Sequence, residues 1–189
     1  MKSRFAVLGL FLALCVVPAF ANSLDIQNRG LLSGSGSSSG INMTSGISQV
    51  RLNGGVLPGI DGSVSFDTGS FTGSLLGGGT FNAGTFEISF DGVGTVLFAS
   101  NFSGSWGKIS DDLYELIGTF SATVNGLQLN GVTKQFFELE SEDGKLSFDD
   151  VHGKTCITPA AVPEPGTLTL LGTGLLGLGG MVRRKLASI

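Results

Sequence analysis

Carboxylates are the most abundant ionisable side chains of this sequence. Glu138, Glu140 and Glu142 alternate along one stretch, and acidic pairs stand at 111–112 and 149–150. Because alternate residues share one face of a strand, these glutamates could offer oxygen ligands to Ca²⁺. The other interpretation is a solvated charged face that keeps an edge strand from pairing with a second chain. No EF-hand loop accompanies the glutamates, which favours the charged face.

A second candidate site is aromatic. Trp106 and Tyr114 are the single Trp and the single Tyr of the chain, and they lie close together in sequence. Their rings could form a stacking platform for sugars on a β-domain. The alternative is that both side chains pack in the core, which accounts for them equally simply.

The residues that catalysis would need are scarce. His152 is the only histidine, so it would have to act as the base for a serine or for Cys156. One His and one Cys are too few ligands for zinc, and we expect His152 to be an exposed loop residue. A Gly-x-Ser-x-Gly match at 36–40 lies in a Ser/Gly tract without the strand-to-helix turn that exposes a nucleophile. The sequence therefore predicts no catalytic residue, no metal, no cofactor and no enzyme activity.

The C-terminal end combines a rigid motif, an apolar run and a basic stop. Pro163, Glu164 and Pro165 keep the chain extended, and residues 167–182 contain no charge and no proline. As a helix these residues would span roughly 24 Å, which is shorter than the hydrocarbon core of about 30 Å. The basic stop then follows the run, and it consists of Arg183, Arg184 and Lys185. By the positive-inside rule the basic end stays in the cytoplasm, so the body of the protein lies on the outer side.

These three parts, in this order, resemble the PEP-CTERM sorting tail of Gram-negative bacteria. The resemblance covers residues 162–185 only, with 163–165 as the Pro-Glu-Pro motif. It implies recognition and cutting by a membrane exosortase, followed by delivery to the cell surface, to the medium or to exopolysaccharide. The alternative is an ordinary single-pass anchor that stays in the membrane.

The N-terminal end predicts a signal peptide at 1–21. It begins with Lys2 and Arg4, continues with an apolar stretch, and ends with small residues at Ala19 and Ala21, where signal peptidase would cut. Together with the tail, this leader predicts an inner-membrane-anchored precursor with its body in the periplasm. Cys15 would leave with the leader, so Cys156 would remain as the single cysteine and no internal disulfide could form.

The remaining 141 residues, 22–162, are enough for one domain with its own core. They carry 14 Asp and Glu against six Lys and Arg, a formal charge of −8. This negative charge argues against a nucleic-acid partner, because phosphate binding needs a basic stripe.

The pattern between the two ends predicts antiparallel strands. Alternation of apolar and polar residues, as at 86–90 and 120–124, is typical of strands with one solvated face. Turn pairs of Asn or Asp before Gly separate these stretches, at 53–54, 61–62, 91–92, 125–126, 130–131 and 143–144. We expect an all-β domain of about eight to ten strands, as a β-sandwich or a meander barrel in which Phe fills volume that Gly leaves.

The predicted segments are a signal peptide at 1–21, a Ser/Gly-rich N-terminal segment at 22–46, an antiparallel β-domain at 47–158, a Pro-rich linker at 159–166, a transmembrane helix at 167–182 and a basic cytoplasmic tail at 183–189. Within the N-terminal segment, the Ser/Gly tract at 33–40 is expected to be a flexible linker or long loop, and Leu24–Asn28 could return as an edge strand. Two functions remain open at this point, and an enzyme is kept as a third, less favoured alternative. The first is an exported surface or matrix protein of unassigned activity. The second is a carbohydrate- or calcium-binding module that uses Trp106, Tyr114 or the glutamates.

Overall fold

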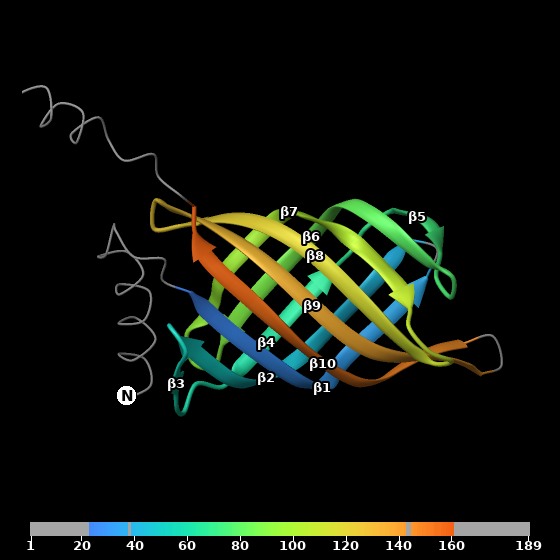
Figure 1. The fold of residues 1–189 in the computed structure, drawn as a ribbon, viewed down its shortest axis with the longest axis horizontal. Coiled ribbons are helices and arrows are strands. Elements are labelled where there is room, and N and C mark those ends of the chain that lie inside the picture. The colour runs from blue at the N-terminus through green and yellow to red at the C-terminus, as the bar shows by residue number, and fades with distance from the viewer. Residues whose placement is uncertain (1–22, 38, 143–144, 161–189) are drawn as a thin grey trace, which may run out of the picture.

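The computed structural model describes residues 23–37, 39–142 and 145–160, and these residues form an all-β structure (Figure 1). Its strands are β1 (Leu24–Ser37), β2 (Gly40–Leu52), β3 (Gly55–Leu57), β4 (Gly62–Asp67), β5 (Phe71–Ser74), β6 (Gly78–Phe90), β7 (Gly94–Lys108), β8 (Leu113–Val124), β9 (Leu127–Glu142) and β10 (Lys145–Pro159). The all-β prediction is confirmed.

Eight of the strands close into an antiparallel barrel. Around the wall the order is β1, β10, β9, β8, β7, β6, β4 and β2, and β2 pairs with β1 again. The short strands β3 and β5 extend β2 and β6 at the two ends. Nearly every neighbour in the wall is also a near neighbour in sequence, so the chain forms an up-and-down meander. The meander barrel is thus the correct one of the two predicted architectures, and the β-sandwich is wrong.

Tight turns fix the register of two hairpins. Asn53 and Asn125 both have φ of 51°, and each is followed by a glycine with φ of 82°. Positive φ at both central residues defines the type I′ turn, whose twist matches that of paired strands. These two predicted turns are confirmed, whereas Asn130-Gly131 lies inside β9 and is no turn. The turn predicted at 143–144 falls outside the described residues.

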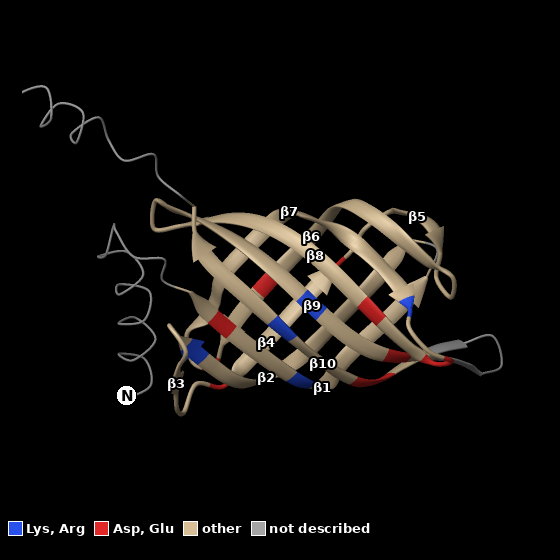
Figure 2. Cartoon of the chain, viewed as in Figure 1, with Lys and Arg blue, Asp and Glu red and all other residues tan. Residues whose placement is uncertain are grey.

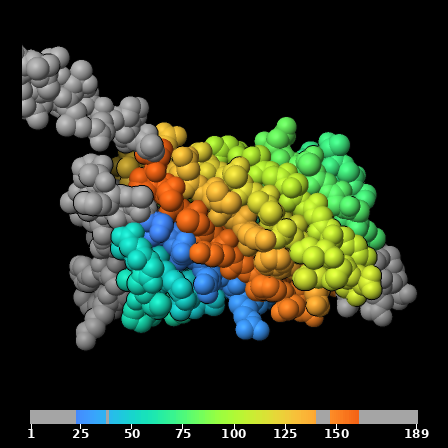
Figure 3. Space-filling view, in the orientation of Figure 1, coloured from blue at the N-terminus to red at the C-terminus, as the bar shows by residue number. Residues whose placement is uncertain are grey.

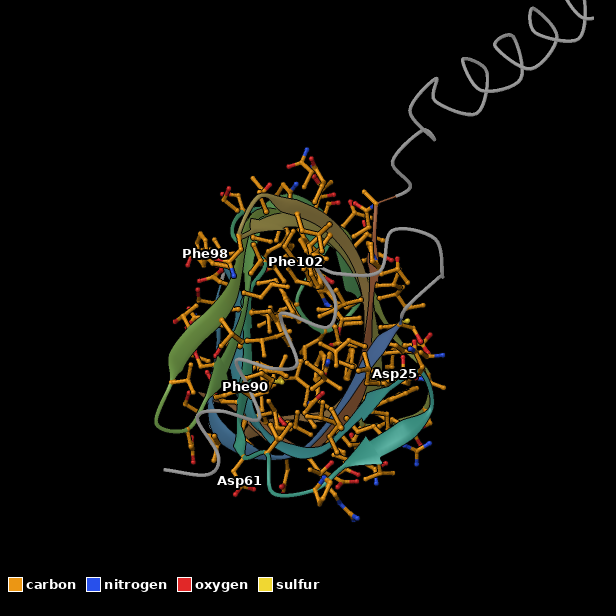
Figure 4. All side chains as sticks on the ribbon, turned by 90° about the vertical axis from the view of Figure 1, so that its left-hand side faces the viewer. Asp25, Asp61, Phe90, Phe98 and Phe102 are labelled. Atoms are coloured by element: carbon orange, nitrogen blue, oxygen red, sulfur yellow. The ribbon has the colours of Figure 1, made fainter. Side chains whose placement is uncertain are left out.

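The barrel interior is filled by large apolar side chains (Figure 4). Phe90 and Phe102 lie inside the wall, whereas Phe98 is 55% exposed on the outside. Phe86 stacks on Phe120 with ring centroids 4.3 Å apart, and Phe102 packs on Phe86 at 5.4 Å. Each buried aromatic ring removes a large apolar area from water, so this cluster is the main source of stability.

Inward-facing glycines make room for these rings. Gly131 is the direct partner of Phe120 across the β8–β9 pair, and a Cβ on Gly131 would overlap the Phe120 ring. A Cβ on Gly118 would likewise overlap the ring of Phe102. The expectation that Phe fills the space left by Gly is therefore met in detail at these positions.

The Ser/Gly tract is part of the barrel. We predicted a flexible linker or long loop at 33–40, with the ordered β-domain starting at residue 47, but residues 24–37 form β1 and residues 40–52 form β2. The prediction is wrong because the two strands pair with each other along the tract, so its backbone groups bond within the hairpin. Leu24–Asn28, expected as an edge strand, pairs on both sides. The β-domain accordingly runs from Leu24 to Pro159 and does not start at residue 47.

The terminal segments of the sequence analysis are not placed. The signal peptide at 1–21, the helix at 167–182 and the basic tail at 183–189 fall outside the described residues. Within 23–37, 39–142 and 145–160, no helix has the length and apolar character that crossing a bilayer requires.

Replacing Gly131 with Ala should destabilise the barrel by about 1–3 kcal/mol, because the new methyl group forces the Phe120 ring off its stack with Phe86. Chemical denaturation measures this loss. Gly107→Ala is the control, since Gly107 lies on β7 and a Cβ at this position would have open space around it. Equal stability of the two variants would show that Phe120 is not packed as described.

Candidate functional site

Trp106 and Tyr114 lie in the barrel interior. Their side chains are 4% and 2% exposed. The indole N–H of Trp106 donates to the carbonyl of Leu75 at 3.2 Å, and the hydroxyl of Tyr114 donates to the carbonyl of Leu76 at 2.8 Å. These bonds tie the turn between β5 and β6 to one mouth of the barrel. The predicted sugar platform on these two rings is wrong, because neither ring face is open to a ligand.

The glutamate site receives no support from the described residues. Glu138 lies half-buried on β9, between Leu113 of β8 and Asp149 of β10. The side chains of Glu140 and Glu142 fall outside the described residues. Among the side chains that are described, no three of His, Cys, Asp or Glu come together in a way that could hold a metal ion.

His152 belongs to a strand, so its prediction as a loop residue is wrong. The β9–β10 register shifts between Asp149 and His152, and Asp150 takes a φ of 40° at this bulge. The bulge turns the His152 side chain to the outer wall, where its ring stacks on Phe136 with centroids 5.2 Å apart and planes 19° apart. Its Nδ1 lies 3.1 Å from the carbonyl oxygen of Asp150.

A groove of about 620 Å³ runs over this part of the outer wall. We call it the outer-wall groove, and its main lining side chains are Gln27, Arg29, Lys134, Phe136, Asp150, His152 and Lys154. A carboxylate oxygen of Asp150 lies 3.9 Å from Nδ1 of His152. Basic positions gather on the neighbouring strands β1, β10 and β9 (Figure 2), which lie side by side across one face of the molecule (Figure 3).

The register of the strands places these side chains in two adjacent rows. Arg29, His152 and Phe136 are direct partners across β1, β10 and β9. One step along the strands, Lys154 is the partner of both Gln27 and Lys134. Partners across neighbouring strands have their Cβ atoms about 5 Å apart, so the rows bring three cations and two rings into one small area.

Two carboxylates flank the rows. Lys154 forms an ion pair with Asp25 at 2.9 Å, and Lys134 forms one with Glu115. The ammonium of Lys134 also lies over the Phe136 ring, 5.1 Å from its centroid. The lysine side chains are about half exposed, so both ion pairs are screened by water and contribute little to folding.

A buried polar network lies behind the groove, inside the barrel. Asn28 donates from Nδ2 to Oε1 of Gln135 at 2.8 Å and to the hydroxyl of Ser45 at 3.0 Å. Gln135 in turn donates to Thr133 at 2.7 Å. The side chain of Gln135 passes over Gly153, where any Cβ would overlap it. The network thus links β1 to β9 across β10 and holds the floor of the groove in place.

In the next row of the outer wall, Asp25 of β1 and Cys156 of β10 are direct partners, and their pKa values are shifted in opposite directions. Burial raises the pKa of the Cys156 thiol, and the hydrogen bond to the Asp25 carboxylate with its negative charge raises it further. Burial also raises the pKa of Asp25, but bonds from Lys154 and Cys156 and the charges of Lys154 and Arg51 lower it below its ordinary value overall. Cys156 is therefore a free, half-buried thiol held in its protonated form.

The chain carries a known motif in its tail. The family model described as the PEP-CTERM protein-sorting motif matches residues 161–185. The resemblance read from Pro163, Glu164 and Pro165 is confirmed, and the match covers no part of the barrel. No curated protein and no solved structure matches the chain.

The sequence analysis missed the outer-wall groove. Lys134 with Phe136 and His152 with Lys154 are two pairs with the spacing of one strand face, on either side of the turn predicted at 143–144. The spacing of these two pairs was the feature of the sequence that could have indicated the groove. It was incomplete, because the bulge after Asp149 changes which residues of β9 and β10 stand opposite each other.

Asn28→Ala should cost about 1–3 kcal/mol of stability, because the Oε1 of Gln135 then loses its donor inside the barrel. Asn42→Ala is the control, since Asn42 is exposed on β2 and shares one long bond with Asp67. Urea titration of both variants makes the comparison. A similar small effect in both would mean that the buried network does not hold β1 to β9.

Asp25→Asn should lower the pKa of the Cys156 thiol, because the negative charge that disfavours the thiolate is removed. The pH dependence of the reaction rate with iodoacetamide reports this pKa. An ordinary thiol has a pKa of about 8.5. In the unaltered protein the reaction rate should rise only above that pH, and the Asp25→Asn variant should react at a lower pH than the unaltered protein. Asp91→Asn, an exposed change in the β6–β7 turn, should leave the profile unchanged. A profile that Asp25→Asn also leaves unchanged would contradict the pairing.

Proposed function

We propose that this chain is an exported protein of the cell envelope or cell surface, handled through its tail by an exosortase-type enzyme. The observation that carries the proposal is the match of the PEP-CTERM protein-sorting motif to residues 161–185. The signal peptide at 1–21, with its Ala19 and Ala21 site for signal peptidase, belongs to the same proposal. The precursor is held in the inner membrane by residues 167–182, with the barrel in the periplasm.

The geometry of the barrel end supports a role for the tail close to the membrane. The last strand ends at Pro159, and the backbone N–H of Ala160 still donates to the carbonyl of Gln128 at 2.8 Å. Pro163 follows three residues later, so it can reach at most about 11 Å from Ala160. An enzyme that acts on the motif therefore works next to the folded barrel.

The chain enters the barrel at the same end at which it leaves it. Leu24 is the partner of Ile157, so the start of β1 lies beside the end of β10. Ser23 is bonded through its backbone to Asn53, which fixes the point where the preceding residues join. Both segments that we assign to the membrane thus join one end of the barrel, and the opposite end, closed by the β5–β6 turn, points away from the membrane.

We further propose that the barrel is a structural or binding domain and not an enzyme. Its interior is packed with aromatic rings, and its buried polar side chains, among them Asn28 and Gln135, bond to one another. This packing supports a role in which the outer wall carries the function. The carbohydrate-binding alternative moves accordingly from the buried Trp106 and Tyr114 to the outside of the barrel.

Mass spectrometry of the protein isolated from its producing cells tests the sorting proposal. We expect a mature chain that begins near Asn22 and ends before the apolar run at 167–182. A double variant, Pro163→Ala with Pro165→Ala, should accumulate uncut, because the motif that the enzyme binds is no longer held extended by its prolines. Pro58→Ala, which removes an exposed proline in a barrel turn, should be processed normally. A mature chain that still ends at Ile189 would contradict processing and favour a permanent anchor.

A further inference from the structure

We propose that the outer-wall groove binds a carboxylate-bearing polysaccharide, with Arg29, Lys134 and Lys154 contacting carboxylates and Phe136 and His152 contacting a sugar ring. This inference goes beyond the proposed function by naming a ligand class for the barrel. It depends on the proposed function only for the place where the ligand is met, because such polymers occur outside the cell. Binding itself is a property of the purified protein.

The charge distribution is the first argument. Residues 22–162 contain six Lys and Arg against 14 Asp and Glu, yet three of the six line this one groove, together with the only histidine and a single carboxylate, that of Asp150. Lys134 and Lys154 are direct partners across β9 and β10. Like charges directly opposite each other destabilise a sheet. Each of the two lysines is paired with one carboxylate of the wall, and an anion that lies between them would relieve the repulsion that remains.

The donors of the groove are available to a ligand. Lys134 and Lys154 each pair with one carboxylate at the rim, but an ammonium group has three donors. Arg29 is exposed, and no salt bridge joins it to another residue within the described part of the chain. Its planar guanidinium can bind a carboxylate through two parallel hydrogen bonds.

The rings argue for a sugar in addition to a charge. The rings of Phe136 and His152 stack on each other with centroids 5.2 Å apart, in the row next to Lys154 and Lys134, and the Lys134 ammonium lies over the Phe136 ring. Aromatic surface beside cations favours an anion that has its own apolar ring face over a small inorganic anion, which has none. A sugar ring with a carboxylate, that is, a uronic acid, has both features.

The shape of the groove favours a polymer over a small molecule. The groove is lined by residues of β1, β10 and β9 on the outer wall, so a chain can enter from the side without a free end. Neighbouring strands lie about 4.8 Å apart, which is comparable to the length of one sugar residue along a chain. Carboxylates on successive sugars would therefore meet cations on successive strands. Double-stranded DNA has one charge per about 1.7 Å, so the acidic domain repels it more strongly and its charges do not match this spacing.

Binding to polygalacturonate tests the proposal on the full chain purified in mild detergent. Isothermal titration should show binding of polygalacturonate and no binding of neutral dextran of similar length. Arg29→Gln and Lys134→Gln should each weaken binding by roughly tenfold, as expected for loss of one charge-assisted contact. Lys108→Gln removes the same charge from the end of β7, outside the groove, and should change binding less than about twofold. Lys134→Arg keeps the charge and should bind as the unaltered protein does.

Several results would overturn the inference. Absence of polygalacturonate binding, or equal losses in Lys108→Gln and Arg29→Gln, would show that the groove is not a specific site. Tighter binding of dextran sulfate than of polygalacturonate would assign the groove to sulfate esters and contradict the carboxylate. Circular dichroism of each variant separates loss of binding from loss of fold, and Arg29→Gln, an exposed change, keeps the test valid if Lys134→Gln does not fold. A negative binding result would not affect the proposal of tail processing, because mass spectrometry tests that proposal separately.

Discussion

The pairing of the first strand with the last is the constraint on which the rest of the structure depends. Six residue pairs join β1 to β10, from Leu24 with Ile157 to Arg29 with His152. This contact closes the sheet, removes its open edges and encloses the aromatic core. It is also the pairing most distant in sequence, so the loop-closure entropy it costs is the largest in the fold. Inside the barrel, the buried bond of Asn28 to Gln135 reinforces the closure, whereas the exposed ion pair of Asp25 with Lys154 outside adds little.

The same closure creates the outer-wall groove and sets the direction of the termini. Arg29 comes from the first strand, whereas His152 and Lys154 come from the last, so the groove exists only in the closed barrel. The bulge in β10 turns His152 outward onto Phe136, and Gly153 leaves the space through which Gln135 reaches Asn28. The pairing of Leu24 with Ile157 also places the start of β1 and the end of β10 at one end of the barrel. One contact therefore connects folding, the candidate binding site and the orientation proposed for the precursor.

Sequence reasoning found the class of fold and the sorting tail but not the site. Alternation and Asn-Gly turns report local backbone geometry, which is why the strands and the turns at Asn53 and Asn125 were predictable. Composition misled at 33–40, since a Ser/Gly tract looks flexible until a partner strand satisfies its backbone. For Trp106 and Tyr114 the sequence left both a surface platform and packing in the core open, because the types of these residues do not tell which face of their strands is buried. Arg29 and His152, over a hundred residues apart, meet only through closure and a bulge.

Amide hydrogen exchange of β1 tests the closed barrel most directly. Asp25, Ile26 and Gln27 pair with β2 on one side and with β10 on the other. In antiparallel pairs successive amides point to opposite neighbours, so closure protects consecutive amides of β1 as strongly as those of β8 and β9. Fast exchange at every second one of these amides would show an open edge at β1. The groove described above would then not exist as a single site.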